Sequence, residues 1–410
     1  MKNKKNSEST FETFYLHRKN KKFAIPKQFP ILNLVLEQEK NGMTEHKPTL
    51  FNEGKLNERA KNHKLQPFKV KQILFELYKN QHTQREAMTT LSKDLRAQLQ
   101  SDFDLLAIEL VEVVEAADTT KFAFKTRDGN LIEAILMYHR QHEKYVQGGK
   151  PKLNRITLCI SSQVGCAMKC LFCVTGKLGF KKDLTWEEMI SQILFANSYI
   201  KKRFGKKEDG SNYAVRNVVF MGMGEPLLNY ENTRKALEIM LKQDRLSLGR
   251  RHITISTCGI IPGIEQLIAD KVDVKLAISL HAPNQELRNQ IMPIGKAYPL
   301  EDLMKTIDRY VQATDNRIFY EYIMIKNLTD TPELAHQLAK LLKGRLAHVN
   351  LIPYNENPAI DLKESEKADL QKFKQILENG GITVTIRDSM GREAKGACGQ
   401  LGYEKVKEQH

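Results

Sequence analysis

Three cysteines within eight residues form the strongest chemical feature of this sequence. They are Cys166, Cys170 and Cys173, in the spacing C-x3-C-x2-C. A structural zinc ion generally takes four protein ligands, and the nearest histidines, His139 and His142, lie well upstream. Three thiolates suit a 4Fe–4S cluster that leaves one iron without a protein ligand. We therefore predict an iron–sulfur site, with a zinc site completed by a distant cysteine as the alternative.

Residues that could bind a small molecule recur at the ends of predicted strands. Glycine lets the backbone approach a ligand closely, and a carboxylate can accept a hydrogen bond from an ammonium group. Each such residue, taken singly, is more often a loop cap or a satisfied core group, but such residues at four strand ends favour a shared site. The residues are Gly224 and Glu225 after the second predicted strand, Ser256 in the third, Ser279, Leu280 and His281 at the fourth, and Asn355 after the sixth.

A repeated alternation of strands and helices must position these residues. Apolar, β-branched runs alternate with helical patterns, which indicates a parallel sheet, either open and doubly wound or closed into an incomplete barrel. In both folds the active site lies at the carboxyl ends of the strands. Thr185 and Glu188 form a predicted capping box that begins the first helix of the alternation. The predicted strands are 156–160, 215–221, 252–257, 274–280, 318–325, 348–352 and 382–386.

The region before this alternation has a different pattern. From about Leu65 apolar residues recur at intervals of three and four, which is typical of helices. Asp128 and Gly129 separate two apolar runs and predict a tight hairpin whose second strand contains Glu133. We therefore expect a basic disordered arm at 1–45, a helical module at 46–117, a hairpin and linker at 118–150, the α/β unit at 151–390 and a C-terminal segment at 391–410.

Composition restricts the partners and the cellular compartment. Lys and Arg total 64 against 49 Asp and Glu, a net charge of +15, which favours a polyanionic partner such as RNA. The alternative is a solvated basic surface on an enzyme with a small substrate. No apolar run reaches the roughly 18 residues of a membrane span. Six cysteines in 410 residues are too few for a disulfide scaffold, so we expect a cytoplasmic protein with no membrane partner.

Four segments closely resemble the RlmN family of RNA adenine carbon-2 methyltransferases, which belongs to the radical S-adenosylmethionine (SAM) superfamily. The likeness runs from about residue 65 to about residue 403, and the cysteine spacing is typical of the superfamily. It implies a partial (β/α)6-type radical SAM barrel with an N-terminal helical accessory domain and a small β-hairpin. The segments are LCISSQVGC at 158–166, FMGMGEPLLN at 220–229, ISLHAPN at 278–284 and ACGQL at 397–401.

The resemblance implies which residues hold the cofactors. Cys166, Cys170 and Cys173 would ligate the 4Fe–4S cluster, and its open iron would bind the amino and carboxylate groups of SAM. Two SAM molecules would be used in each turnover. Further SAM contacts would come from the residues at the strand ends, namely Gly224, Glu225, Ser256, Ser279, Leu280, His281 and Asn355.

The resemblance also implies a catalytic route, because carbon 2 of adenine is electron-poor and cannot attack a SAM methyl group by ordinary displacement. Cys398 would first accept a methyl group from one SAM. A 5′-deoxyadenosyl radical from the second SAM would then remove a hydrogen atom from that methyl, and the resulting radical would add to the adenine. Glu133 would accept the ring proton, although an outward-facing strand carboxylate is a competing interpretation. Cys159 would release the RNA by attacking Cys398 and forming a disulfide.

The implied substrates are an adenosine of 23S ribosomal RNA at the peptidyl transferase centre and an adenosine in the anticodon loop of some tRNAs. The helical module would bind RNA, and a flavodoxin- or ferredoxin-type protein would donate electrons to a monomeric enzyme.

Two alternatives stay open at this point. One is methylation at carbon 8, as in the related Cfr enzymes, although Pro226, Leu227 and Leu228 look more like the RlmN pattern. The other is a non-catalytic RNA-binding protein stabilised by zinc through Cys258 or Cys398.

Overall fold

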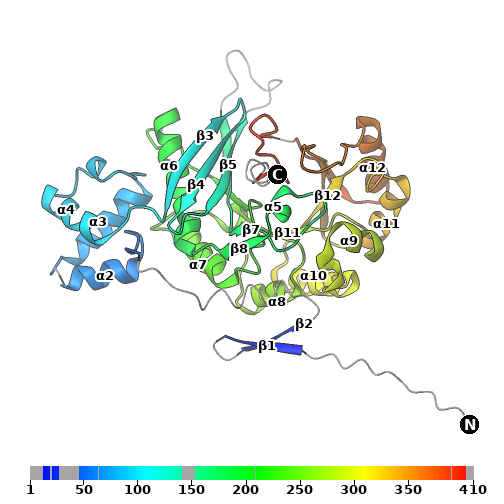
Figure 1. The fold of residues 1–410 in the computed structure, drawn as a ribbon, viewed down its shortest axis with the longest axis horizontal. Helices are drawn as coiled ribbons and strands as arrows, with labels where there is room; N and C mark the ends of the chain where they lie inside the picture. The colour runs from blue at the N-terminus through cyan, green and yellow to red at the C-terminus, as the bar shows by residue number, and fades with distance from the viewer. Residues whose placement is uncertain are drawn as a thin grey trace, which may run out of the picture.

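A ten-stranded sheet forms the centre of the computed structural model (Figure 1). The structure describes residues 13–18, 21–26, 46–62, 64–140, 153–207, 209–388 and 390–402. The strand order is β14-β13-β12-β11-β10-β9-β6-β5-β4-β3. The strands β7 and β8 form a separate two-stranded sheet, and apart from them each strand lies beside the strand that follows it in sequence. Within these residues no helix combines the length and the apolar character that a membrane span requires.

Seven strands of this sheet are parallel, and they confirm the seven predicted runs. Buried residues alternate with partly buried ones in β9 and β10, whereas β12 is buried at all but one residue and pairs with β13 over its whole length. The parallel strands form an α/β barrel that remains open between β14 and β6. This confirms the expected fold class, a partial α/β barrel. The strands are β6 (Leu153–Cys159), β9 (Asn217–Phe220), β10 (Ile253–Thr257), β11 (Lys275–Ser279), β12 (Ile318–Met324), β13 (Ala347–Pro353) and β14 (Thr383–Ile386).

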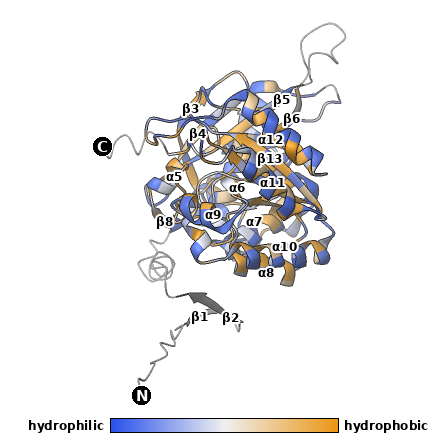
Figure 2. Cartoon of the chain, turned by 90° about the vertical axis from the view of Figure 1, so that its right-hand side faces the viewer, coloured by the Kyte–Doolittle hydropathy of each residue, from blue (hydrophilic) through white to orange (hydrophobic). Residues whose placement is uncertain are grey.

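Helices surround the parallel strands on the outside (Figure 1). In α10 the apolar residues Leu303, Met304 and Ile307 are buried at helical spacing, and Figure 2 shows polar residues on its other side. Burial of this apolar face against the strands orients the helix. The helices are α6 (Trp186–Phe204), α7 (Tyr230–Leu241), α8 (Ile261–Ala269), α9 (Gln285–Ile291), α10 (Leu300–Thr314), α11 (Pro332–Leu342) and α12 (Lys367–Asn379).

The predicted capping box begins α6. The Thr185 side chain accepts a hydrogen bond from the backbone N–H of Glu188, and the Glu188 carboxylate accepts one from the backbone N–H of Thr185 at 2.8 Å. Lys182 of the preceding strand donates to the same carboxylate at 2.9 Å. This network fixes the start of the long helix directly after the loop that contains the three clustered cysteines.

Three antiparallel strands extend the parallel sheet at the β6 edge. They are β3 (Ile108–Glu115), β4 (Thr119–Thr126) and β5 (Leu131–Arg140), and β5 pairs with β6. The sequence analysis predicted the turn at Asp128 and Gly129 but missed β3, which it assigned to the helical module ending at 117. The expected small hairpin is therefore a three-stranded extension of the main sheet. The reason is visible in β3, where Glu recurs at every third residue rather than at alternate residues, and the strand exposes most of its side chains.

The N-terminal helices lie at the side of the barrel (Figure 1). They are α2 (Glu53–Asn62), α3 (Pro67–Tyr78) and α4 (Lys93–Asp102), and they contact the barrel partly through the edge-to-face rings of Phe51 and Trp186 at 5.8 Å. Within the arm expected to be disordered, β1 (Thr13–Arg18) and β2 (Lys21–Pro26) pair antiparallel, which differs from the expectation. The remainder of 1–45 and most of the expected linker before 151 lie outside the described residues.

The capping box yields a stability prediction. Thr185→Ala removes the side chain that caps α6, so we expect the free energy of unfolding to fall by about 1 kcal/mol. Guanidinium-induced unfolding followed by circular dichroism measures this change. Thr89→Ala is the control, because Thr89 is exposed and lies outside the helices. Equal stabilities of the two variants would contradict the role given to the cap.

Candidate active site

The clustered cysteines lie in a loop at the carboxyl end of β6, as predicted for the first parallel strand. The short strands β7 (Gln163–Gly165) and β8 (Phe180–Asp183) pair antiparallel and bracket the loop, and α5 (Val174–Lys177) follows Cys173 directly. The backbone N–H of Cys166 donates to the Gly179 carbonyl at 3.0 Å, and that of Leu171 donates to Ile291 at 2.9 Å. The loop is therefore anchored both to its own hairpin and to α9.

The three thiols influence one another electrostatically. Burial raises the pKa of Cys166 to about 12 and that of Cys170 well above its usual value, and in both cases neighbouring cysteines raise it further. Burial also raises the pKa of Cys173. Each side chain is nevertheless partly accessible to solvent. Thiolates can therefore persist together here only beside compensating positive charge, which bound iron would supply.

The donor set fits an iron–sulfur cluster. In the described part of the chain, no group of three or more His, Cys, Asp or Glu side chains is arranged to hold a metal ion. A 4Fe–4S cluster makes a different demand, because each cysteine binds a different iron and the thiolates need not converge on one ion. Three neighbouring thiols from one loop, partly accessible and surrounded by protein, meet that demand.

Gly224 and Glu225 form the turn after β9, beside the start of the cysteine loop. Gly224 has φ +99°, and a Cβ atom there would lie 2.4 Å from the Cβ of Gln163, so only glycine fits. Glu225 is buried, and its carboxylate accepts hydrogen bonds from the backbone N–H groups of Leu227 at 3.0 Å and Cys258 at 2.8 Å. These two backbone donors join the loops that follow β9 and β10. An ammonium group as a further partner of this carboxylate stays a prediction.

The predicted residues after β10 and β11 lie at the same end of the sheet. Ser256 is in β10 and Ser279 ends β11, while Leu280 is fully buried. His281 has φ +57°, and its ring contacts Phe172 of the cysteine loop edge to face at 4.8 Å. The Nδ1 atom of His281 lies 3.1 Å from the backbone N–H of Ile323 and accepts from it, so Nε2 holds the ring proton.

The electrostatic setting keeps this imidazole neutral. Burial lowers the pKa of His281 to about 3, and the nearby Arg288 guanidinium lowers it further. At neutral pH the side chain is therefore an uncharged donor through Nε2.

Asn355 links the predicted site to the C-terminal segment. Its side chain is buried after β13, where Nδ2 donates to the Cys398 carbonyl at 3.1 Å and Oδ1 accepts from Arg392 at 2.8 Å. The cysteine loop contacts the same segment, because the backbone N–H of Val174 donates to Gly399 at 2.8 Å. Cys398 is therefore held between the loop of the clustered cysteines and the end of β13.

Cys159 and Cys398 come together although they lie 239 positions apart in the chain (398 − 159). Cys159 ends β6 and is buried, and burial followed by the proximity of Cys398 raises its pKa. Burial also raises the pKa of Cys398, and Cys173 adds to this effect. The Cys398 side chain is nevertheless exposed to solvent. The second cysteine pair and the cluster loop thus belong to one site.

Glu133 faces this site from β5, and the competing interpretation of an outward-facing carboxylate is wrong. Its side chain is 13% exposed and forms an ion pair with Lys121 of β4 at 3.3 Å. Its second oxygen accepts from the backbone N–H of Gly402 at 2.6 Å. Lys121 is itself almost fully buried, so the pair lies inside the protein. The carboxylate is therefore held beside the segment that contains Cys398.

Sequence reasoning missed three charged residues of this region. Lys121 is one, and Arg288 of α9 is another. The third is Glu321 of β12, whose buried carboxylate accepts from Asn350 at 2.8 Å and raises the pKa of Cys398. A charged residue within an otherwise apolar strand was the available signal, since Glu321 interrupts the run IFYEYIM.

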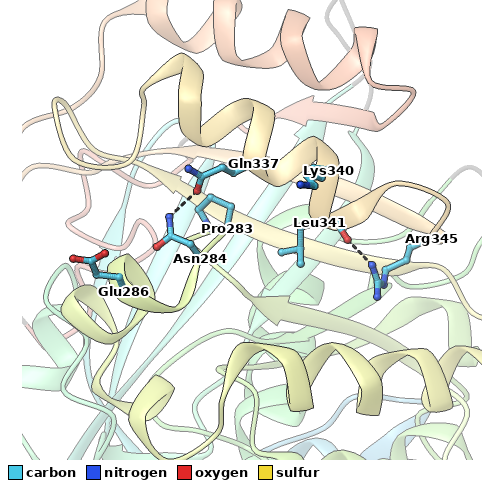
Figure 3. Close-up of a pocket in the computed structure, with 7 residues that line it drawn as sticks. All are labelled: Pro283, Asn284, Glu286, Gln337, Lys340, Leu341 and Arg345. Carbon is cyan, nitrogen blue, oxygen red and sulfur yellow. Dashed lines mark hydrogen bonds between the residues drawn. The ribbon is translucent and has the colours of Figure 1, made fainter.

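A separate pocket lies between α9 and α11 and contains none of the predicted catalytic, metal or cofactor residues (Figure 3). Its volume is about 700 Å³, and Asn284 donates across it to Gln337 at 2.7 Å. It is an outer groove between helices rather than part of the cysteine site. The residues that line it are Pro283, Asn284, Glu286, Gln337, Lys340, Leu341 and Arg345.

Comparison with known proteins identifies close relatives. The model of the radical SAM superfamily matches residues 160–338. The protein named "Probable dual-specificity RNA methyltransferase RlmN" of Dictyoglomus thermophilum is 41% identical over 82% of this chain and 90% of its own length. The protein of that name in Aquifex aeolicus is 40% identical over 83% of this chain and 93% of its own length. The crystal structure of a radical SAM methyltransferase from Sphaerobacter thermophilus, 36% identical, covers 88% of this chain and 99% of its own with a TM-score of 0.77.

The hairpin that brackets the cysteine loop yields a second prediction. A Cβ atom at Gly165 would lie 1.8 Å from the Gly179 carbonyl oxygen, so Gly165→Ala must displace the hairpin beside Cys166. We expect this displacement to weaken cluster binding by more than about 1.4 kcal/mol. Iron and sulfide loading should then fall by at least about tenfold at limiting iron. Anaerobic reconstitution with iron and sulfide analysis measures the loading.

Gly179→Ala is the matched control for this measurement. Gly179 also has a positive φ, +69°, but a Cβ atom there would meet nothing within 4 Å. We expect this variant to keep most of its iron, at a backbone cost of about 1 kcal/mol. Equal loading of the two variants would show that the hairpin does not position the cysteines.

Proposed function

Because this chain belongs to the RlmN family of radical SAM RNA methyltransferases, we propose that it methylates carbon 2 of an adenosine in 23S ribosomal RNA and of an adenosine in the anticodon loop of some tRNAs. Family membership excludes the non-catalytic zinc protein as a description of this chain. The observation that best supports the finer proposal is the meeting of Cys159, Cys398 and the clustered cysteines at one end of the sheet. A methyltransferase that used SAM alone would need no such second thiol pair.

Cys166, Cys170 and Cys173 would hold the 4Fe–4S cluster of the superfamily. When bound, the cluster supplies the electron that cleaves SAM and so provides the radical chemistry that an electron-poor ring carbon requires. The backbone of Gly224 and Glu225 would face SAM, together with Ser256, Ser279, Leu280, His281 and Asn355. Of these, His281 offers an uncharged donor at Nε2, and the Glu225 carboxylate contributes indirectly by fixing two loops.

Cys398 would accept a methyl group on its sulfur and present it to the adenine, so that two SAM molecules serve one turnover. Its accessibility to solvent supports this role, because the thiol must meet both SAM and the RNA base. Asn355 and the cysteine loop fix the backbone on both sides of Cys398, so the sulfur can be presented in a defined direction.

Glu133 would accept the proton from the ring carbon once the methyl carbon has joined it. The ion pair with Lys121 supports this role, because it fixes the position of the carboxylate inside the protein. The hydrogen bond from Gly402 orients the same carboxylate toward the C-terminal segment.

Cys159 would release the product. Its sulfur attacks the Cys398 sulfur, a disulfide forms, and the bond from Cys398 to the transferred carbon breaks. That carbon leaves with the electron pair and takes up the proton that the Cys159 thiol gives up, which completes the methyl group. An external thiol must then reduce the disulfide. Burial keeps the Cys159 thiol neutral until that step, which protects it from reaction with SAM.

RNA would contact the basic surface of the molecule, including the helical module as an RNA-binding accessory domain. Phe68, Lys71 and Phe75 are exposed on α3 at positions that share one helix face. An aromatic and basic face of this kind suits unpaired bases and phosphates. We propose further that the enzyme acts as a cytoplasmic monomer, and that a flavodoxin- or ferredoxin-type protein reduces its cluster.

Loss of the methyl-accepting thiol provides the third prediction. Cys398→Ala should abolish methylation of ribosomal RNA in vitro while leaving iron and sulfide content unchanged, because Cys398 is not a cluster ligand. Nucleoside mass spectrometry of the RNA treated with unsubstituted protein should find 2-methyladenosine. Recovery of 8-methyladenosine would instead assign the Cfr-type reaction, and methylation by the Cys398→Ala protein would refute the thiol route.

Loss of the second thiol gives a different expected product. Cys159→Ala should still join the methyl carbon to adenine but fail to release it, so a covalent protein–RNA adduct accumulates. Denaturing gel electrophoresis with labelled RNA detects the adduct, and nuclease digestion should remove it. The double variant Cys159→Ala, Cys398→Ala is the control and should form none. Normal turnover by Cys159→Ala would show that the thiol has no part in release.

A further inference from the structure

Arg288 is a fully buried cation beside the cysteine loop. It belongs to α9, and its side chain is among the largest that the fold encloses, with the residue 1% exposed. The backbone N–H of Leu171 donates to the carbonyl of Ile291 in the same helix, which ties the loop of the clustered cysteines to the element that holds Arg288. The guanidinium interacts electrostatically with the thiols of Cys170 and Cys258.

The hydrogen bonds of Arg288 go to neutral acceptors. Nη2 donates to the carbonyl of Cys258 at 2.6 Å, and Nη1 donates to those of Leu280 at 2.6 Å and Ser279 at 3.1 Å. Nη1 also lies 3.5 Å from the sulfur of Met292. Nε is buried without a partner. Among the residues that the structure describes, no carboxylate forms an ion pair with this guanidinium.

The acidic groups nearby do not neutralise it. Glu225 accepts from the backbone N–H of Cys258, whereas Arg288 donates to the carbonyl of that residue, so the two charges contact different sides of one strand end. Burial raises the pKa of Glu225 and of the Cys258 thiol, which favours their uncharged forms. A buried cation without an anion is strongly unfavourable, so the completed site must provide a negative charge.

An iron–sulfur cluster on three thiolates provides that charge. Its total charge is negative and becomes more negative on reduction, and Cys170 is one of its ligands under the proposed function. We propose that the Arg288 guanidinium is the fixed counter-charge of the cluster and raises the potential at which the cluster accepts an electron. This inference rests on the proposed function. Arg288 acts through the cluster and touches no reacting atom, so it is a positioning residue.

A fixed positive charge favours the reduced cluster because the added electron increases the negative charge beside it. The effect is stronger inside the protein than in water, since no solvent screens the interaction. The electron would come from a low-potential flavin or iron–sulfur donor, and a higher cluster potential makes that one-electron transfer more favourable.

The test is a potentiometric titration of the anaerobically reconstituted full chain without SAM, in which electron paramagnetic resonance measures the reduced cluster. Arg288→Gln removes the charge and keeps two donors, whereas Arg288→Lys keeps the charge. At the midpoint potential of the unsubstituted protein, we expect the reduced-to-oxidised ratio to fall at least about tenfold in Arg288→Gln, which is 59 mV for a one-electron couple. Arg288→Lys should stay close to the unsubstituted protein.

A second pair of variants leaves Arg288 in place. Met292 is fully buried against the guanidinium, so Met292→Glu would neutralise it in the fold, whereas Met292→Gln has the same shape without the charge. We expect Met292→Glu to lower the reduced-to-oxidised ratio as Arg288→Gln does, and Met292→Gln to leave it unchanged. This pair decides the matter if substitution of Arg288 prevents cluster assembly.

Three outcomes separate the possible errors. Equal shifts in Arg288→Gln and Arg288→Lys, or no shift in Arg288→Gln and Met292→Glu, would overturn the inference. A normal potential combined with weaker SAM binding by equilibrium dialysis in Arg288→Gln would assign the guanidinium to the SAM carboxylate and also overturn it. An unsubstituted protein that binds no iron and sulfide would refute the proposed function itself, which the Arg288 variants alone cannot do.

Discussion

The desolvation of several neighbouring thiols is the physical constraint on which the site depends. Burial raises the pKa of five cysteines, namely Cys159, Cys166, Cys170, Cys173 and Cys398, although Cys398 keeps solvent-exposed surface. Thiolates in such surroundings require positive charge close by, and the buried Arg288 guanidinium interacts electrostatically with the Cys170 thiol. The site therefore combines soft sulfur donors, buried positive charge and hydrogen bonds to the backbone of the loops.

The antiparallel extension brings a carboxylate into the region of the thiols. Because β5 pairs with β6, Ile135 of β5 lies opposite Cys159, and Glu133 lies two residues before Ile135 in the same strand. Alternate residues of a strand share one face, so Glu133 and Ile135 point to the same side of the sheet. A strand added to the edge of the barrel thus supplies a second carboxylate, in addition to Glu321 of the parallel strand β12.

Much of this architecture could be predicted from the sequence. The seven parallel strands were predicted because apolar, β-branched runs recur at regular intervals, and the capping box predicted the start of α6 from Thr185 and Glu188 alone. The cysteine spacing gave the site its chemistry. The strand β3 was missed because its exposed glutamates hide the apolar pattern, and the arm was assigned no structure because its composition is polar and basic.

Contacts between distant segments could not be predicted in the same way. Lys121, Arg288 and Glu321 gain their meaning from burial and from partners far along the chain, and a single sequence contains neither. The backbone partners of the Glu225 carboxylate could not be predicted for the same reason, because they lie in loops that only the folded sheet brings together. Local patterns therefore predicted the candidate ligands of the site, whereas the electrostatics required the structure.

The C-terminal segment connects two distant parts of the open sheet, namely β5 and the loop that follows β13. Gly402 donates to Glu133 of β5, Asn355 after β13 donates to the Cys398 carbonyl, and Thr175 of the cysteine loop donates to Leu401 at 2.8 Å. Cys398 consequently reaches its position only when both of these parts of the sheet are already folded. A partly folded molecule would expose its cysteine loop without Cys398 beside it, so the last segment of the chain completes the candidate site.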